Sequence, residues 1–399
     1  MDTPTISLFS GILLLLIAAT VAIRSLRRYV DYGVDPAILN TFQVRLRTWW
    51  ILFGLLACVF FVGPLATTFF FFVLSVAVLR EYITLTPKSP ADHQTLFWIY
   101  VLLTPLQFAL VGVNPDWFKQ LTGILPYQVF SLLLPGYLFL ILPGMMAVSG
   151  DPKRFLERTA KLQLGMMVCV YALSYAPALL TLELSARTTQ ITKNTDANQR
   201  GTAKDSATAP ILQDGLESSV IKTFGGASEE TQTEFVPTSL SQGQENATES
   251  ALPQLFRVVP LMDGKHFQLL VVFMLLVQLN DVFQFLWSHI AQRHFVAEKI
   301  NSTRTWEGVF GGALTTALLA VLLWYFTPFP KWWQAGLTGF AVGLMGFAGN
   351  MTMSAIKRDR GVSGYGSLIQ GHSGFLDRMD SLCFVAPVFY HLVWLFGKF

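Results

Sequence analysis

The chain has 399 residues, of which 52% are hydrophobic and only 13% are charged, and its mean hydropathy is +0.48. A soluble globular protein carries roughly 25% charged residues, so this composition excludes an ordinary water-soluble domain and indicates an integral membrane protein. The net charge is only +3 and the basic residues form no continuous run, which argues against nucleic-acid binding.

Ten apolar stretches are candidate membrane helices, although some are short for a crossing of roughly 20 residues. They cover residues 6–23, 49–63, 65–80, 97–113, 124–148, 161–182, 266–289, 309–327, 335–350 and 382–397. No strand-like alternation competes with helix formation, and a helix satisfies its own backbone hydrogen bonds in lipid. We therefore predict an all-α polytopic membrane protein with about ten transmembrane helices. The second and third stretches meet at Val62-Gly63-Pro64, which is a compact turn signal.

A hydrophilic insert at residues 185–262 separates the apolar stretches into two groups. It is rich in Ser, Thr, Gln and acidic residues, so it buries too little apolar surface to offset chain entropy, and we predict that it is disordered. The chain then divides into N-terminal transmembrane helices at 1–184, the insert, and a C-terminal transmembrane half at 263–399. About six spans fall in the first part and about four in the last.

Basic residues predict the orientation. With the N-terminus outside, the clusters at 24–28, 153–161 and 357–360 lie inside, and the short outside loops hold only Lys119 and Lys331. Lysine and arginine favour the cytoplasmic side, so this orientation is strongly preferred and the insert is extracytoplasmic. Basic residues follow the first apolar stretch, whereas in a signal peptide they precede the apolar region. We therefore interpret that stretch as a retained helix. We expect a bacterial inner membrane.

The seventh apolar stretch contains polar residues at helical spacing. Asp281, Gln284 and Ser288 share one helix face. A carboxylate within the membrane is costly and usually marks a functional cavity, although a helix–helix hydrogen bond is the simpler alternative.

The loop after this stretch combines hydroxyl groups with a cation. Ser302 or Thr303 is the predicted N-cap of the next helix, and Glu307 falls near its first turn. Hydroxyls, Arg304 and a helix N-terminus together favour phosphate binding. A capped helix beside a juxtamembrane arginine would have the same pattern, so this alternative stays open.

The last inside loop is the richest in reactive side chains. It contains Lys357, Arg358, Gly371, His372, Gly374, Asp377, Arg378 and Asp380. The basic residues can neutralise phosphates, and glycines let the backbone approach a ligand. Asp377 and Asp380 would face the same way if a helix starts there, which suits Mg²⁺ held against phosphate oxygens. A positive-inside anchor would explain the basic residues, but not two carboxylates and a histidine.

Residues 354–381, SAIKRDRGVSGYGSLIQGHSGFLDRMDS, resemble the signature of phosphatidate cytidylyltransferases (CDP-diacylglycerol synthases): Ser-x-x-Lys-Arg, a spacer with Lys-Asp, then Gly-His-Gly-Gly-x-x-Asp-Arg-x-Asp. The segment from Ser302 to Gly308 is similar to the family's Ser-Pro-x-Lys-Thr-x-Glu-Gly, and Asp281 stands where the family has an aspartate. The resemblance covers residues 278–397. Earlier, only Arg80-Glu81 looks like a pair found in many members.

The sequence departs from the family's pattern at several positions. The family's Lys-Asp is Ser363-Gly364 here, its Gly-Asp is Gly349-Asn350, its second loop glycine is Ser373, and its loop lysine is Arg304. The loss of two carboxylates bears on metal affinity. Asn350 still offers a neutral oxygen and Gly364 offers none, while Asp359 is near enough in sequence to replace one carboxylate in part.

The resemblance implies transfer of CMP from CTP to phosphatidate, with Mg²⁺ as cofactor, a second cation as a further option, and a homodimer as a further expectation. Asp281, Lys357, Arg358, His372, Asp377, Arg378 and Asp380 are the expected catalytic residues. The expected substrate-binding residues are Ser302, Arg304, Glu307, Gly371 and Gly374, with Glu307 orienting a basic residue. The expected metal ligands are Asp281, Asp377, Asp380 and Asn350.

Other interpretations stay open. A CTP-dependent isoprenoid-alcohol kinase belongs to the same superfamily, and the lost carboxylates are compatible with a catalytically weakened member. A membrane transporter is the alternative from another class. Transporters often have two similar halves, whereas the reactive residues lie only in the second half of this chain.

Overall fold

The computed structural model describes residues 3–26, 36–85, 92–148, 151–182, 264–362 and 374–397. These residues belong to the first of two units, which is formed by Met1–Glu183 and Arg257–Phe399. The second unit, Leu184–Phe256, lies outside the described residues, so the predicted disorder of the insert is not addressed by the structure.

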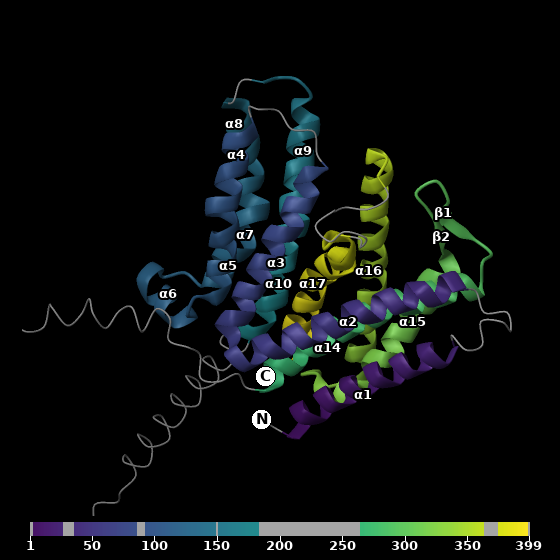
Figure 1. Ribbon diagram of the computed structural model, residues 1–399. Helices are drawn as coiled ribbons and strands as arrows, with labels where there is room; N and C mark the ends of the chain where they lie inside the picture. The colour runs from purple at the N-terminus through teal and green to yellow at the C-terminus, as the bar shows by residue number, and fades with distance from the viewer. Residues whose placement is uncertain are drawn as a thin grey trace, which may run out of the picture. The chain divides into compact units, whose positions relative to one another are not determined.

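The regular elements of the N-terminal half, within its described residues, are all helices (Figure 1). Helix α2 ends at Val62 and α3 begins at Pro64, with Gly63 at φ 121°, which confirms the predicted turn and requires glycine. Three longer helices then contain π turns. The elements of this half are α1 (Thr3–Leu26), α2 (Pro36–Val62), α3 (Pro64–Thr84), α4 (His93–Trp98), η3 (Ile99–Leu103), α5 (Thr104–Gly112), α6 (Pro115–Thr122), α7 (Pro126–Leu132), η4 (Leu133–Leu138), α8 (Phe139–Val148), α9 (Phe155–Gly165), η5 (Met166–Ala172), α10 (Leu173–Ala178) and η6 (Leu179–Thr181).

Prolines account for two of the π turns. Pro105 lies just after η3, and Pro135 lies inside η4. Proline cannot donate a backbone hydrogen bond, and its ring crowds the carbonyl four residues earlier. A π turn widens the helix there and relieves the clash without ending the helix.

The C-terminal half places a short hairpin between two helices (Figure 1). Helix α15 packs against both α14 and α16, and α16 packs against α17. The elements are α14 (Gly264–Ile290), β1 (Phe295–Ala297), β2 (Asn301–Thr305), α15 (Trp306–Leu322), η7 (Trp324–Phe326), α16 (Trp332–Arg360) and α17 (Leu376–Phe396).

The hairpin is an addition to the predicted all-α fold. Strands β1 and β2 are antiparallel, with Phe295 opposite Thr305 and Ala297 opposite Asn301. The predicted N-cap at Ser302 or Thr303 is wrong, because both residues lie in β2. Thr305 is the N-cap: its backbone is still extended, and its hydroxyl accepts a hydrogen bond from the Gly308 amide at 3.1 Å.

The helices meet the length and composition required of membrane spans. Eight of them in the described chain are long and apolar enough to cross a bilayer. Two of the ten predicted spans, 49–63 and 309–327, correspond to shorter apolar helices at Trp49–Val59 and Trp306–Leu322. Many large apolar side chains are exposed, including Leu14, Phe69 and Leu140, which is expected where lipid is the solvent. The predicted polytopic helical membrane protein is therefore confirmed.

Small residues allow close packing of α14, α15 and α16. A Cβ atom added to Gly343 of α16 would lie 2.5 Å from the Ala313 Cα of α15. Helices in lipid associate largely through such packing, since burial from water gives no driving force there. The close contact brings polar side chains of α14 within hydrogen-bond reach of the Thr316 hydroxyl of α15 and of the Gly343 carbonyl of α16.

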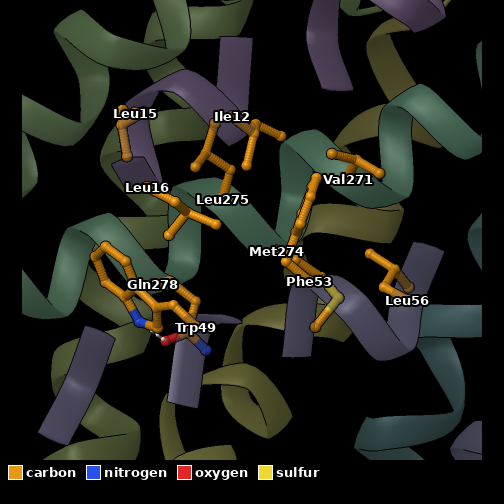
Figure 2. A pocket seen from close by; sticks show the side chains of 10 residues that line it. All are labelled: Ile12, Leu15, Leu16, Trp49, Phe53, Leu56, Val271, Met274, Leu275 and Gln278. Atoms are coloured by element: carbon orange, nitrogen blue, oxygen red, sulfur yellow. Dashed lines mark hydrogen bonds between the residues drawn. The ribbon is translucent and has the colours of Figure 1, made fainter. Parts of the chain in front are cut away.

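A second packing feature joins the first helices to α14. Figure 2 shows an apolar pocket between α1, α2 and α14. Its volume is about 60 Å³. At one edge, Trp49 Nε1 donates a hydrogen bond to Gln278 Oε1 at 2.8 Å. Gln278 lies one helical turn before Asp281, so this contact anchors the part of α14 that carries the candidate site.

Candidate active site

The first turn of α17 carries two of the expected carboxylates. The helix begins at Leu376, ahead of the predicted span at 382–397, so the condition that a helix starts beside Asp377 is met, and Asp377 and Asp380 lie in its first turn and a half. The Leu376 amide donates a hydrogen bond to Glu81 Oε2 of α3 at 2.8 Å. Glu81 is 2% exposed, and its other oxygen, Oε1, has no hydrogen-bond partner among the described residues. A buried carboxylate at a helix N-terminus is favourable, and it fixes where α17 starts.

Gly374 is the only described glycine of the two expected to bind substrate. A Cβ atom at this position would lie 2.5 Å from Glu81 Oε2. Glycine is therefore needed for contact with Glu81, which is a structural role. Gly371 and His372 lie outside the described residues, and so do Ser363, Gly364 and Ser373.

Ser381 connects three helices through one hydroxyl group. Its Oγ donates a hydrogen bond to Asp281 Oδ1 of α14 at 2.8 Å and accepts one from Asn350 Nδ2 of α16 at 3.2 Å. Its backbone amide donates to Asp380 Oδ1 at 2.7 Å. The structure thus brings together Asp281, Asn350 and Asp380, which lie far apart in sequence.

Charges accumulate around Asp380, which is 7% exposed. It interacts electrostatically with Asp281 and Asp377, which repel its charge, and with Lys357, which attracts it. Lys357 forms an ion pair with Asp377. The arrangement holds several carboxylates beside one lysine, so it is suited to a ligand that brings additional positive charge.

Among the described residues, no three His, Cys, Asp or Glu side chains converge closely enough to form a metal site. Mg²⁺ does not require such a cage, because it is usually held by one or two carboxylates together with substrate phosphates and water. Asp281 and Asp380 are oxygen donors joined through Ser381, so the donor chemistry fits Mg²⁺. Asp377 is paired with Lys357, which makes it the less suitable ligand.

Arg304 is held by a polar network between the helices. Its Nη1 donates to Gln284 Oε1 at 3.2 Å, and Gln284 Nε2 donates to Asn280 Oδ1 at 3.2 Å and to the Gly343 carbonyl at 2.8 Å. Arg304 is buried. The polar face predicted for α14 therefore makes two separate contacts: Asp281 accepts a hydrogen bond from Ser381 of α17, and Gln284 accepts one from Arg304 of β2.

Three other expected residues lie in or beside the β1–β2 hairpin, and Arg378 lies on α17. Arg358 is exposed and its Nε donates to the Ile300 carbonyl at 3.2 Å. Ser302 is exposed on β2, and Arg378 is half-buried in the first turn of α17. Glu307 Oε1 lies 2.6 Å from His294 Nδ1. Glu307 thus contacts a histidine, where we expected it to orient an arginine or lysine.

Asp359 does not join the carboxylates of α17 and α14. Its Oδ2 lies 3.5 Å from Arg360 Nε and 3.9 Å from Lys161 Nζ of α9. The expectation that it replaces a lost family carboxylate gains no support from these contacts.

Sequence reasoning missed Ser381 and the role of Glu81. The available signals were the position of Ser381 directly after Asp380, and the Arg80-Glu81 pair, for which no partner could be assigned. Neither signal identifies the helix that is contacted.

Comparisons of the sequence with known proteins identify one family. A model described as the cytidylyltransferase family matches residues 43–396. The uncharacterised protein YnbB of Escherichia coli (strain K12) is 30% identical over 383 residues, which is 95% of each chain. Phosphatidate cytidylyltransferases match over a shorter length. The Synechocystis enzyme is 40% identical over 95 residues, 24% of this chain and 32% of its own, and the chloroplastic enzyme 5 of Arabidopsis thaliana is 39% identical over 102 residues, 25% of each.

Proposed function

The chain belongs to the cytidylyltransferase family, and from this membership we propose that it transfers CMP from CTP to phosphatidate. The products are CDP-diacylglycerol and pyrophosphate. The observation that carries the proposal is the contact of Asp281 with Ser381, which joins the acidic residue of α14 to the start of α17. The partial matches to phosphatidate cytidylyltransferases support the choice of lipid, although they cover a third or less of those enzymes.

The reaction requires charge neutralisation more than a strong base. An oxygen of the phosphatidate phosphate attacks the α-phosphorus of CTP, the bond from that phosphorus to the bridging oxygen of the β-phosphate breaks, and pyrophosphate leaves. Both reactants are anionic, so positioned cations supply most of the catalysis. Lys357 and Arg304 are the described cations tied to the carboxylate cluster and to α14, and we assign them to the phosphates of the reactants.

The carboxylates beside these cations are assigned to metal binding. Asp281 and Asp380 would hold Mg²⁺, which when bound supplies positive charge to the phosphate oxygens of CTP. Ser381 would orient both carboxylates, and Asn350 would orient Ser381. Arg358, Arg378 and Ser302 stay assigned to substrate phosphates as part of this proposal.

The same proposal includes the location. Lysine and arginine accumulate on the loops that carry the candidate site, so that site would face the cytoplasm, where CTP is available. Phosphatidate would enter from the surrounding membrane. A bacterial inner membrane is the proposed setting.

The first experiment measures product formation by purified protein with Mg²⁺, with and without phosphatidate, using CTP labelled on its α-phosphate. Label in a CDP-lipid that depends on phosphatidate supports the proposal. A parallel reaction uses CTP labelled on its γ-phosphate together with an isoprenoid alcohol, and label in the lipid of that reaction would indicate a lipid kinase. No transfer of the α-phosphate label to phosphatidate would contradict the proposed activity.

Asp380→Asn tests the site in the same assay. The change keeps the size of the side chain and removes its charge, so turnover should fall by about 10²-fold or more while the melting temperature in detergent is maintained. Glu298→Gln, in the exposed hairpin turn, is the matched loss of a carboxylate and should leave turnover unchanged. Full turnover by Asp380→Asn would remove this residue from the site.

A further inference from the structure

A second cavity lies between α3, α9 and α16, beside the candidate active site. Its volume is about 300 Å³, which is within the range of ligand pockets. Two cations, one carboxylate and several apolar side chains are among the residues that line it: Leu85, Lys161, Leu164, Ile356, Asp359 and Arg360. The apolar pocket of Figure 2 contains no charged residue and is only about 60 Å³, so the two cavities differ in chemistry.

The arginine of this cavity has unused donor capacity. Arg360 Nη2 is buried without a hydrogen-bond partner among the described residues, and its nearest carboxylate oxygen, Glu157 Oε1, is 3.8 Å away. Asp359 Oδ2 lies 3.5 Å from Arg360 Nε, but the Asp359 side chain is 66% exposed and can turn toward water. A guanidinium group can donate two hydrogen bonds to one phosphate, so Arg360, which lines the cavity, would give its buried nitrogen a partner by turning toward a phosphate bound there.

Lys161 supplies the second positive charge. Its ammonium group pairs with Glu157 one turn earlier on α9 and lies 3.9 Å from Asp359. Lysine and arginine from two different helices therefore face one cavity. A phosphate with two negative charges would bring the pair together.

The apolar walls select among phosphate ligands. Leu85, Leu164 and Ile356 come from the three elements that form the cavity, so apolar surface lies on each side. A nucleoside triphosphate gains little from contact with such walls, whereas the first methylene groups of a lipid gain by being buried against them. The chemistry favours a lipid whose headgroup is a phosphate monoester.

The cavity adjoins the candidate active site through two residues. Tyr82, which lines it, directly follows Glu81, the residue that caps α17. Arg360 lies three residues beyond Lys357, which pairs with Asp377. A phosphate held by Arg360 would therefore lie about one helical turn of α16 from the catalytic lysine.

We propose that the cavity between α3, α9 and α16 binds the phosphate headgroup of the lipid substrate through Lys161 and Arg360. This inference rests on the proposed function, since it names the place from which phosphatidate reaches the carboxylates. It assigns lipid recognition to residues of both halves of the chain, and neither Lys161 nor Arg360 is among the expected catalytic or substrate-binding residues.

Kinetics with each substrate varied in turn tests the assignment. Arg360→Gln and Lys161→Gln should each raise the KM for phosphatidate in mixed micelles on the order of tenfold, with the KM for CTP unchanged. Asp359→Asn removes a competing carboxylate and should lower the KM for phosphatidate, which a purely structural role would not do. Lys153→Gln, an exposed lysine outside the cavity, is the charge control. A rise in the KM for CTP alone, or no change in either KM, would overturn the proposal.

A binding measurement separates this proposal from the proposed reaction. Dioctanoyl phosphatidate should raise the melting temperature of the wild-type protein in detergent, and dioctanoyl phosphatidylcholine should not. Arg360→Gln should lose most of the shift, and Lys153→Gln should keep it. A melting shift with phosphatidate but no turnover would contradict the proposed reaction and still support the proposed binding site. If Arg360→Gln changes neither turnover nor the melting shift, the binding-site proposal is contradicted and the proposed reaction is not.

Discussion

Ser381 determines the relation between the carboxylates of α14 and α17. Its hydroxyl contacts Asp281 and Asn350, and its amide contacts Asp380. Ser381→Ala removes the hydroxyl and leaves Asp281 and Asn350 without their shared partner. Residues that orient metal-binding or catalytic groups typically affect activity by 10–100-fold, so we expect turnover to fall by roughly that factor and the requirement for Mg²⁺ to rise.

The control for this change is Ser75→Ala in the N-terminal half. The Ser75 hydroxyl is also buried and donates one hydrogen bond, to the Cys169 carbonyl at 2.7 Å. Ser75→Ala should lose about 1 kcal/mol of stability and Ser381→Ala about 1–3 kcal/mol, because Ser381 bonds a carboxylate, but only Ser381→Ala should need more Mg²⁺ for half-maximal turnover. Equal Mg²⁺ profiles in the two variants would reduce Ser381 to a packing residue.

The sequence indicated the charged residues of the candidate site, but it did not indicate the hydrogen-bond partners that position them. The family resemblance predicts that Asp281 and Asp380 converge, because it makes both of them metal ligands. Ser381 could not be identified, because a serine next to an aspartate in a helix has several faces available. Glu307 shows the same limit: its position near the first turn of α15 followed from the cap pattern, but its partner His294 depends on how the hairpin folds back.

At the scale of elements, α3 positions the start of α17. The Glu81 carboxylate accepts a hydrogen bond from the Leu376 amide in a buried setting. Glu81→Ala would leave that amide unsatisfied and should cost about 1–3 kcal/mol, measured as a lower melting temperature. Turnover should fall with it, because Asp377 and Asp380 follow within the first turns of α17.

Glu81→Gln separates geometry from charge. The amide side chain keeps an oxygen acceptor for Leu376, so most of the stability should return. If Glu81→Ala melts at the wild-type temperature, the carboxylate does not define the start of the helix, and the adjoining Gly374 needs another explanation.

Close packing of α15 on α14 leads to a prediction at Gly308. An added Cβ would lie 1.8 Å from Ser288 Oγ and 3.0 Å from the Gln284 backbone carbonyl. Gly308→Ala should therefore force the two helices apart and cost about 1–3 kcal/mol or more. Gly54→Ala in α2 is the matched control, since an added Cβ meets nothing within 4 Å and alanine favours a helix. A Gly308→Ala protein as stable as Gly54→Ala would contradict the packing.

The helical elements followed from the sequence because lipid leaves few alternatives for an apolar stretch. The hairpin β1–β2 did not, because a mostly polar segment between two spans, here residues 290–308, forms a loop as readily as a hairpin. Its pairing depends on contacts with α16, where Asn301 Nδ2 donates to Ser354 Oγ at 3.2 Å. Such tertiary contacts override local propensity, so the N-cap moved from Ser302 or Thr303 to Thr305.

At the scale of the whole molecule, the proposed chemistry depends on which side of the membrane each helix end faces. Helix α16 runs from Trp332 to Arg360, and at about 1.5 Å per residue it separates Lys331 from Lys357 by roughly 39 Å. This length exceeds the roughly 30 Å hydrocarbon layer, so the two lysines should lie on opposite faces. The bias of lysine and arginine predicts that Lys357 is cytoplasmic and that Lys331 is outside.

Thiol labelling tests this orientation. Lys331→Cys and Lys153→Cys, each in a protein whose exposed Cys58 is replaced by serine, place a reactive group on exposed positions at the two faces. A membrane-impermeant maleimide should label Lys331→Cys in intact cells, and should label Lys153→Cys only after the membrane is permeabilised. The buried Cys169 and Cys383 should stay unlabelled and serve as internal controls. The reverse pattern would put the carboxylate cluster on the face without CTP, and no arrangement of Asp281 and Asp380 could then sustain the proposed reaction.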